Sequence, residues 1–297
     1  IYIGLGRSDI PFYFNGIGLI LNIILDPVFI FGIGPVPALG SAGAATATCL
    51  SQVVVLMLFV YHLKKKNGLL GSFPFFIRLH KRHLRNILKL GLPVAAMNMY
   101  FAFISMNLAR IASIYGGHLG VTSQTAGGQI EGITWSTSQG FSTALGSFVA
   151  QNYAAHRMDR AWKAYRYTLF LMGTLGIIIS LGFILKGENI FALFIPEKAA
   201  YEAGGEYLFI MGISQLFMML ELTTQGMFNG IGKTTIPAVI SIAFNTLRIP
   251  LAVFLAGTMG ITGVWWAISL SSILKGIVSP TWFYFLQRKI RSASRQK

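Results

Sequence analysis

The chain has 297 residues, of which 54% are hydrophobic and only 11% are charged. Soluble domains carry about 25% charged residues, so this composition excludes an ordinary soluble protein. The net charge of +15 at pH 7 does not indicate nucleic acid as a partner, because the basic residues are concentrated between apolar segments. We therefore expect an all-α polytopic membrane protein whose partner is the lipid bilayer.

The apolar segments predict about eight transmembrane helices, each long enough to cross a bilayer. Their approximate ranges are 10–32, 40–63, 89–115, 119–152, 161–185, 203–229, 236–257 and 260–286. Alternate connections hold almost all the Lys and Arg, which is the positive-inside pattern. It predicts a multi-pass protein of the cell (inner) membrane, with both ends of this chain in the cytoplasm.

The first and the seventh predicted spans are introduced by nearly the same phrase. GLGRSDIP runs from Gly4 to Pro11, and GIGKTTIP runs from Gly230 to Pro237. Two further motifs follow each phrase in the same order: Asn22 with Pro27 and Gly40 with Gly43 in the first copy, and Asn245 with Pro250 and Gly260 with Gly263 in the second. Both copies enter the membrane from the same side, which predicts a transporter built from parallel repeats.

The repeat divides the chain into two predicted lobes and two basic segments. Residues 1–63 form a partial N-terminal lobe, and residues 89–286 form a C-terminal lobe of six helices. The linker, 64–88, mixes basic and aromatic residues, so we expect a cytoplasmic connector that includes a surface-lying amphipathic helix. Residues 287–297 form a basic cytoplasmic tail.

These motifs resemble those of the multidrug and toxic compound extrusion (MATE) transporters. The resemblance covers about residues 1 to 286 and rests on GLGRSDIP, NIILDP, LGSAGAATA, LPVA, Gln129-Ile130, VAQNYAA and GMFNGIGKTTIP. It implies two six-helix lobes related by a pseudo-twofold axis, of which this chain holds the end of the fourth span and spans five to twelve. By that resemblance the chain, which begins with Ile1, is a piece truncated at its N-terminus.

The resemblance also implies a function, which is secondary antiport by alternating access. The expected substrate is an organic cation or drug, a small amphipathic compound, exported in exchange for H⁺ or Na⁺ by a monomer that needs no cofactor. In some family members a key acid follows the early Pro of the seventh span by eight residues. Counted from Pro93, that position is Phe101 here, so this acid is not assigned to the chain.

Ionisable residues inside the spans are the candidate coupling residues, because each costs roughly 2.5–3.5 kcal/mol at a helix centre. Glu131 lies near mid-depth in a span so rich in Ser, Thr, Gln and Gly that we expect it to line a cavity. Glu221 lies in a Met-rich span. Each glutamate either exchanges H⁺ or Na⁺ for substrate or forms a permanent salt bridge, for which Arg248 is the expected counter-charge.

Five further residues complete the set assigned to substrate or cation coupling. Asn22 and Asp26 share a helix face beside Pro27 and either coordinate a cation or hydrogen-bond to each other. Lys275 is either a charge in the cavity or the partner of an acid. Asn245 and Gln129 are included because they belong to the repeated and family motifs.

Two other functions remain open from the residues. A flippase for lipid-linked oligosaccharides or polysaccharides, of the same superfamily, would need a more strongly basic cavity to hold pyrophosphate. An intramembrane enzyme would need a catalytic or metal motif, and the sequence holds no Asp-rich metal motif, no HExxH and no convincing nucleophile–base pair. We therefore expect a transporter and no enzyme.

Overall fold

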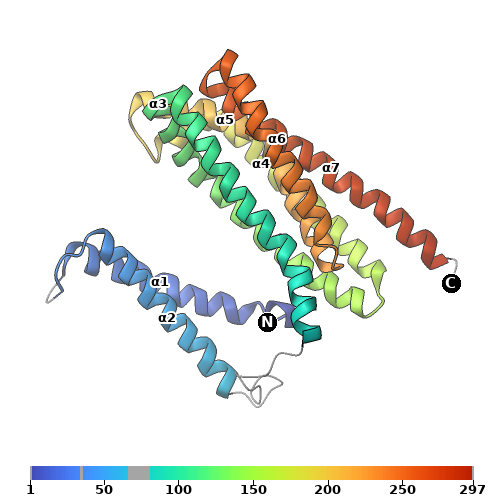
Figure 1. The fold of residues 1–297 in the computed structure, drawn as a ribbon. Coiled ribbons are helices and arrows are strands. Elements are labelled where there is room, and N and C mark those ends of the chain that lie inside the picture. Colours follow the sequence, from blue (N-terminus) through green and yellow to red (C-terminus); the bar gives the residue numbers. More distant parts are fainter. Residues whose placement is uncertain (1, 34–35, 66–80, 296–297) are drawn as a thin grey trace. The chain divides into compact units, whose positions relative to one another are not determined.

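The computed structural model describes residues 2–33, 36–65 and 81–295 as helices joined by short connections, without a strand in these ranges (Figure 1). A short 3-10 helix, Ile3–Leu5, comes first. The long helices are α1 (Asp9–Phe31), α2 (Ser41–Lys65), α3 (Lys81–Ala154), α4 (Met158–Ala192), α5 (Lys198–Gly230), α6 (Thr235–Met259) and α7 (Ile261–Arg295). All seven helices of this described part are long and apolar enough to cross a membrane. The prediction of an all-α polytopic membrane protein is confirmed.

The chain divides into two compact units, Ile1–His80 and Lys81–Lys297. The first unit contains α1 and α2, and the second contains α3 to α7. Most of the linker expected at 64–88, with its surface-lying helix, lies outside the described residues. The basic segment expected from residue 287 begins as the last turns of α7, which ends at Arg295.

Helix α3 supplies two spans. Its 74 residues would extend about 110 Å as one straight helix, far more than the roughly 30 Å of a hydrocarbon core. The chain turns back at Gly117, whose φ of 54° and ψ of −147° are accessible to glycine and strained for other residues. Figure 1 shows one limb rising to this turn and the other returning. The predicted break between 115 and 119 is confirmed, and with it the described residues form eight long helical segments.

The sequence repeat is also a repeat of backbone geometry. Gly6 and Gly232, which occupy equivalent positions in the two introducing phrases, have φ values of 75° and 74°. Further along, a Cβ on Gly43 would lie 2.2 Å from the carbonyl oxygen of Phe29, and a Cβ on Gly263 would lie 2.4 Å from the backbone of Leu255. In both copies the second helix therefore packs directly on the end of the first through a glycine, as small residues allow between membrane helices.

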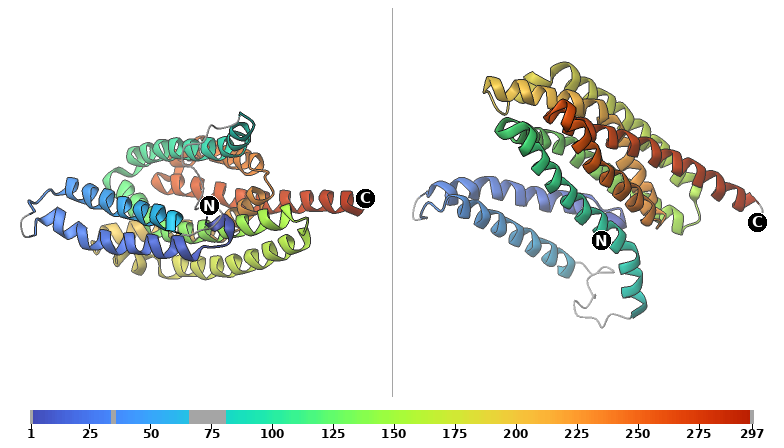
Figure 2. Two further views of the ribbon diagram at one scale, coloured as in Figure 1. Left: turned by 90° about the horizontal axis from the view of Figure 1, so that it is seen from below. Right: turned by 45° about the horizontal axis from the view of Figure 1, so that its top comes forward.

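Helix α5 is the most enclosed helix of the second unit and contacts α3, α4 and α7 (Figure 2). Glycines permit the close approach: a Cβ on Gly226 would lie 2.3 Å from the backbone of Ser142 in α3, and a Cβ on Gly276 of α7 would lie 2.3 Å from the backbone of Phe217. The Tyr207 and Trp265 rings pack edge to face, with centroids 5.4 Å apart. These contacts fix α5 between α3 and α7.

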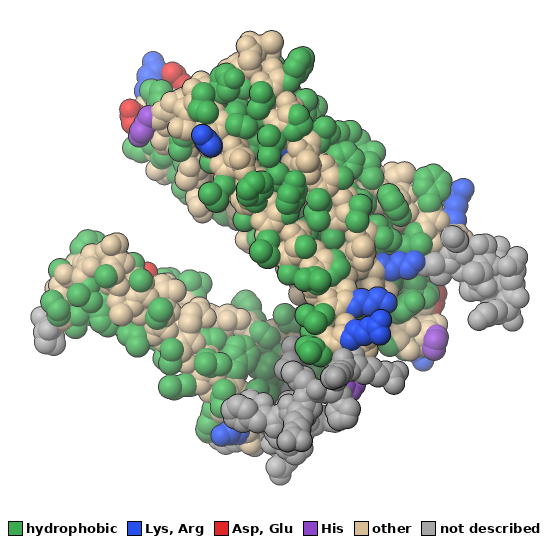
Figure 3. Space-filling view, viewed as in Figure 1, with side chains coloured by type: hydrophobic (Ala, Val, Ile, Leu, Met, Phe, Trp, Pro, Cys, Tyr) green, Lys and Arg blue, Asp and Glu red, His purple; other side chains and the backbone are tan. Residues whose placement is uncertain are grey.

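The outer surface of the second unit is apolar. Large hydrophobic side chains are exposed on it, among them Met99, Met106, Phe170, Phe254 and Phe285. Figure 3 shows hydrophobic side chains over most of the visible face of this unit, with most of the visible Lys and Arg gathered near one end. Such a surface is suited to contact with lipid. Contact with lipid does not explain the polar residues inside the unit, because polar groups are costly within a membrane.

Candidate functional site

A cavity of about 520 Å³ lies within the second unit, between the two limbs of α3 and helices α5, α6 and α7. Each helix contributes a stripe of residues spaced by three and four positions, which places them on one helix face. On α5 the stripe is Tyr207, Met211, Ser214, Met218, Glu221 and Gln225; on α6 it is Ser241, Asn245 and Arg248; on α7 it is Ile268, Ser272 and Lys275. The helical periodicity of the sequence therefore places these side chains together around the cavity.

The limb of α3 that follows Gly117 contributes a carboxylate and two glycines to the cavity wall. Its stripe is Gln124, Gly128, Glu131, Gly132, Trp135 and Gln139. A Cβ added at Gly128 or Gly132 would meet no atom within 4 Å. These two glycines therefore leave room beside Glu131 that a larger side chain would occupy.

Glu131 is held by neutral hydrogen-bond donors. The Tyr207 hydroxyl donates to its Oε1 at 2.5 Å, and the Gln215 amide donates to its Oε2 at 3.0 Å. The Thr134 hydroxyl lies 3.0 Å from Gln215 Oε1, which leaves the amide nitrogen facing Glu131. Among the described residues, the ion pairs within 4.0 Å do not include Glu131. The carboxylate is thus oriented by its neighbours without being neutralised by a paired cation.

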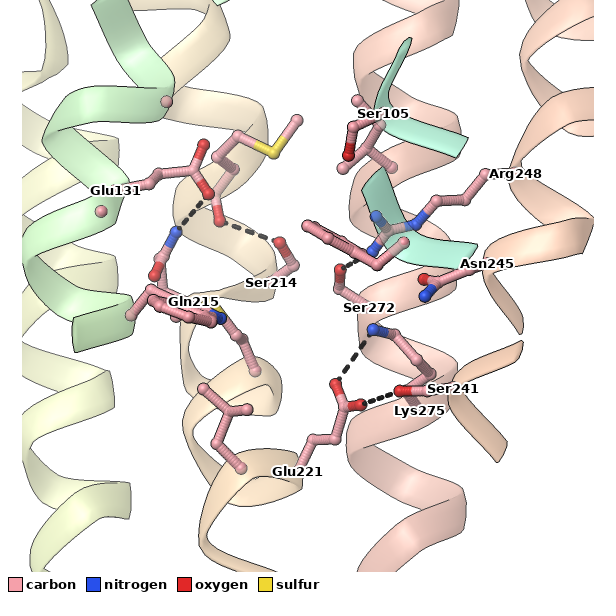
Figure 4. Close-up of a pocket in the computed structure, with 18 of the residues that line it drawn as sticks. Ser105, Glu131, Ser214, Gln215, Glu221, Ser241, Asn245, Arg248, Ser272 and Lys275 are labelled. Carbon is pink, nitrogen blue, oxygen red and sulfur yellow. Dashed lines mark hydrogen bonds and ion pairs between the residues drawn. The ribbon is translucent and has the colours of Figure 1, made fainter. Parts of the chain in front are cut away.

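The second carboxylate of the cavity is neutralised. Glu221 lies with its Oε2 3.2 Å from Lys275 Nζ, and the Ser241 hydroxyl donates to its Oε1 at 3.2 Å (Figure 4). Both Glu221 and Lys275 are buried. A buried pair of this kind holds two helices together, because removing one partner leaves a buried charge without compensation.

Arg248 is the buried cation of the opposite wall. Its Nε donates to the Ser271 hydroxyl at 2.5 Å, and its Nη2 donates to the Ser272 hydroxyl at 2.9 Å. The Phe101 ring lies with its centroid 6.0 Å from the guanidinium carbon. Figure 4 shows Arg248, Asn245, Ser272 and Lys275 on one side of the cavity, with Glu131 and Gln215 on the other.

The structure brings together five of the eight residues assigned to coupling: Glu131, Glu221, Asn245, Arg248 and Lys275 line the same cavity. Gln129 is exposed and is absent from the lining, because it lies on another face of α3. Asn22 and Asp26 lie in the first unit, where the Asn22 amide donates to Asp26 Oδ1 at 3.3 Å. This contact is the hydrogen-bonded pair that the sequence allowed as one alternative.

The ion pair of Glu221 is with Lys275, which is one of the two alternatives that the sequence left open for Lys275. Arg248, named from the sequence as the expected counter-charge of a glutamate, forms no ion pair within 4.0 Å among the described residues. The reason is geometric: Lys275 comes from α7, which packs closely on α5, and Arg248 is held by two serines of the same α7. Phe101, the position where some family members place an acid, contacts Arg248 instead.

Two residues of the site were missed by the sequence analysis. Tyr207 and Gln215 hold Glu131, yet neither carries a charge that would mark it inside a span. The signal that could have found them is the face of α5 on which Tyr207, Ser214 and Glu221 recur every seven residues, with Gln215 next to Ser214. In the described part of the chain there is no group of three His, Cys, Asp or Glu residues that could hold a metal ion.

Comparisons with known proteins agree on one family. The MatE family model matches residues 93–254. The chain is 26% identical over 285 residues to a protein of Shewanella oneidensis named "FAD transporter", covering 95% of this chain and 62% of the relative. It is 28% identical over 272 residues to the "Probable multidrug resistance protein YoeA" of Bacillus subtilis, covering 88% of this chain and 58% of the relative.

The fold is shared with solved structures. A crystal structure described as "MATE in complex with MaL6" superposes with a TM-score of 0.87 at 24% identity, covering 100% of this chain and 66% of that one. The chain spans about three fifths of the length of the curated relatives described above. The helices described here therefore correspond to part of a larger transporter fold, as expected from one partial and one complete lobe.

Proposed function

The chain belongs to the MATE family of membrane transporters, and from this premise we propose that it exports small amphipathic organic compounds, organic cations or drugs foremost, in exchange for H⁺ or Na⁺. The observation that carries the proposal is the state of Glu131. It is a carboxylate inside a membrane cavity that accepts hydrogen bonds from the neutral Tyr207 and Gln215, and no ion pair within 4.0 Å among the described residues includes it. Such a group is available to a cation from outside the protein.

The coupling ion and the substrate exchange because the Glu131 carboxylate binds only one cation at a time. The Tyr207 hydroxyl and the Gln215 amide support the ionised carboxylate by hydrogen bonds. A proton or Na⁺ that arrives from one side of the membrane neutralises Glu131 and removes the attraction for a cationic substrate. On the other side the ion leaves and the cationic substrate takes its place, which couples the two movements in opposite directions.

Glu221 has a different role in this proposal. Lys275 lies 3.2 Å from it, so neither an incoming proton nor a cationic substrate finds an uncompensated charge there. We assign Glu221 and Lys275 to holding α5 against α7. Of the two acids in the cavity, Glu131 is then the one that carries coupling.

The names of the relatives support a small organic substrate. One is named for the transport of FAD and the other for multidrug resistance. The cavity is lined by two acids, Glu131 and Glu221, and two basic residues, Arg248 and Lys275. Lys275 is paired with Glu221, so the cavity lacks the excess of positive charge expected of a site for a lipid pyrophosphate. This favours export over the flippase alternative. We place the protein in the cell (inner) membrane as a monomer, with both ends of the chain in the cytoplasm.

The test is transport by the purified protein in proteoliposomes. A fluorescent organic cation is loaded, and a proton gradient or a Na⁺ gradient is imposed separately. We expect dye movement to follow one of the two gradients and to stop when an ionophore collapses that gradient. Dye movement that ignores both gradients would refute antiport, and movement of a lipid-linked saccharide in place of the dye would restore the flippase alternative.

A further inference from the structure

Arg248 keeps part of its hydrogen-bonding capacity unused. A guanidinium has five N–H groups, and the contacts of Arg248 with Ser271 and Ser272 occupy one on Nε and one on Nη2. The ion pairs within 4.0 Å among the described residues are Arg7–Asp9, Lys198–Glu202 and Lys275–Glu221, and none of them includes Arg248. Only 5% of Arg248 is exposed, so its charge has little contact with water, and no carboxylate of the described residues forms an ion pair with it within 4.0 Å.

Asn245 lies beside Arg248 and is also unsatisfied. It precedes Arg248 by three positions on α6, so the two side chains share one helix face. Asn245 is only 2% exposed, lines the cavity, and has a side-chain oxygen with no hydrogen-bond partner. That oxygen is a hydrogen-bond acceptor and cannot bind an oxyanion, so the part of Asn245 that can donate to an oxyanion is its amide NH2 group.

The surroundings of Arg248 suit the end of an amphipathic molecule. Phe101 offers an aromatic ring next to the guanidinium, and Ser272 lines the same wall. The two serines fix the guanidinium plane from α7, and a planar fork of this kind matches an oxyanion with two parallel hydrogen bonds. Lys275 does not compete for that anion, because Glu221 already neutralises it.

We propose that Arg248, with Asn245 and Ser272 beside it, forms an oxyanion subsite in the cavity, which takes a carboxylate or phosphate group of the transported compound. This rests on the proposed function, since it specifies the substrate class of the same cavity. A preferred substrate then carries an aromatic body with an oxyanion at one end. The oxyanion binds at Arg248, opposite Glu131 (Figure 4), so a basic group on the same molecule finds its partner across the cavity.

Equilibrium binding to the purified protein in detergent tests the subsite without any gradient. The probes are a cationic xanthene dye with a free carboxylate and the methyl ester of the same dye, which differ only in the oxyanion. We expect the acid to bind more tightly than the ester. Arg248→Gln is expected to weaken acid binding by roughly tenfold or more and to leave ester binding nearly unchanged, while Arg248→Lys falls between.

Two variants keep the test valid if Arg248→Gln does not fold. Asn245→Asp changes one atom type and places a carboxylate beside Arg248, so it is expected to exclude the acid dye and retain the ester. Ser272→Ala removes one support of the guanidinium and is expected to weaken the acid alone. The matched control is Arg110→Gln, which removes an exposed arginine of α3 outside the cavity and is expected to change neither dye.

Competition identifies the oxyanion. Benzoate and phenyl phosphate are added to the acid dye; displacement by both supports a general oxyanion subsite, and displacement by one alone names the group. Equal binding of acid and ester by the wild type, or equal losses for both dyes in Asn245→Asp and Ser272→Ala, would overturn the subsite. Selective binding of the acid dye by a protein whose transport does not respond to ion gradients would support the subsite and refute antiport.

Discussion

Lys275 and Glu221 form a buried ion pair across two helices, with 3.2 Å between Nζ and Oε2, while Glu131 in the same cavity forms no ion pair within the described part of the chain. This difference in ion pairing distinguishes Glu221 from Glu131, two acids for which the sequence predicts the same alternatives. One acid is committed to the contact between α5 and α7, and the other is free to exchange partners.

The ion pair is expected to contribute to stability. Glu221→Gln leaves Lys275 as a buried charge without compensation, and we expect the free energy of unfolding to fall by about 3–5 kcal/mol. Thermal unfolding in detergent measures it. Adding Lys275→Gln to Glu221→Gln is expected to recover part of the loss, because the second change removes the stranded charge.

Glu202→Gln is the matched control for that pair, since Glu202 forms an exposed ion pair with Lys198 at 3.8 Å. We expect it to cost less than about 1 kcal/mol, because water already screens the charges of a surface pair. If Glu202→Gln and Glu221→Gln lowered the melting temperature equally, the structural role of the buried pair would be refuted.

The Tyr207 contact with Glu131 is expected to depend on Gly127. A Cβ on Gly127 would lie 2.3 Å from the Tyr207 ring, so Gly127→Ala must displace that ring and weaken its hydrogen bond to Glu131. We expect a loss of about 1–3 kcal/mol in stability together with reduced gradient-driven efflux. Gly140→Ala is the control, because a Cβ there meets no atom within 4 Å and the position lies outside the cavity lining. Equal effects of the two substitutions would argue against this positioning.

The size of accepted substrates is expected to depend on Gly132. This glycine lines the cavity, and a Cβ on it would meet open space, so Gly132→Leu fills volume that a substrate would use. We expect binding of a bulky three-ring dye to weaken by roughly tenfold while a single-ring cation still binds. Gly140→Leu adds the same side chain at an exposed position of the same limb and should leave both ligands unaffected.

The local features of the fold could be predicted because their signals are local. The break at Gly117 follows from a polar and glycine-containing gap between two apolar runs, and the equivalence of Gly43 and Gly263 follows from the repeated motif. That Glu131 lines a cavity follows from the polar composition of its helix, which cannot face lipid. Each of these inferences needs only the helical period and the cost of polar groups in hydrocarbon.

The partners across the cavity could not be predicted in the same way. Whether Glu221 pairs with Lys275 or with Arg248 depends on the rotation and depth of α5 against α6 and α7, which sequence spacing does not determine. Tyr207 is separated from Glu131 by 76 positions, and an aromatic residue in a membrane span carries no signal of its own. These contacts are long-range products of packing.

The repeat itself gives a test of packing. Gly263→Ala would place a Cβ 2.4 Å from the backbone of Leu255, so we expect it to push α7 away from α6 and to cost about 1–3 kcal/mol. Gly257→Ala, at an exposed position of α6 with open space, is expected to be neutral or slightly stabilising. Thermal unfolding of both variants measures the difference, and a neutral Gly263→Ala would contradict the packing described here.

The most direct test of Glu131 as the coupling carboxylate compares two transport modes of Glu131→Gln in proteoliposomes. The variant is expected to exchange substrate for substrate at equilibrium and to lose its response to an imposed ion gradient, because glutamine keeps the shape and cannot take up a proton or Na⁺. Glu206→Gln, which removes an exposed acid of the same α5 outside the cavity, should respond like the wild type. A Glu131→Gln protein whose efflux still follows the gradient would contradict the account.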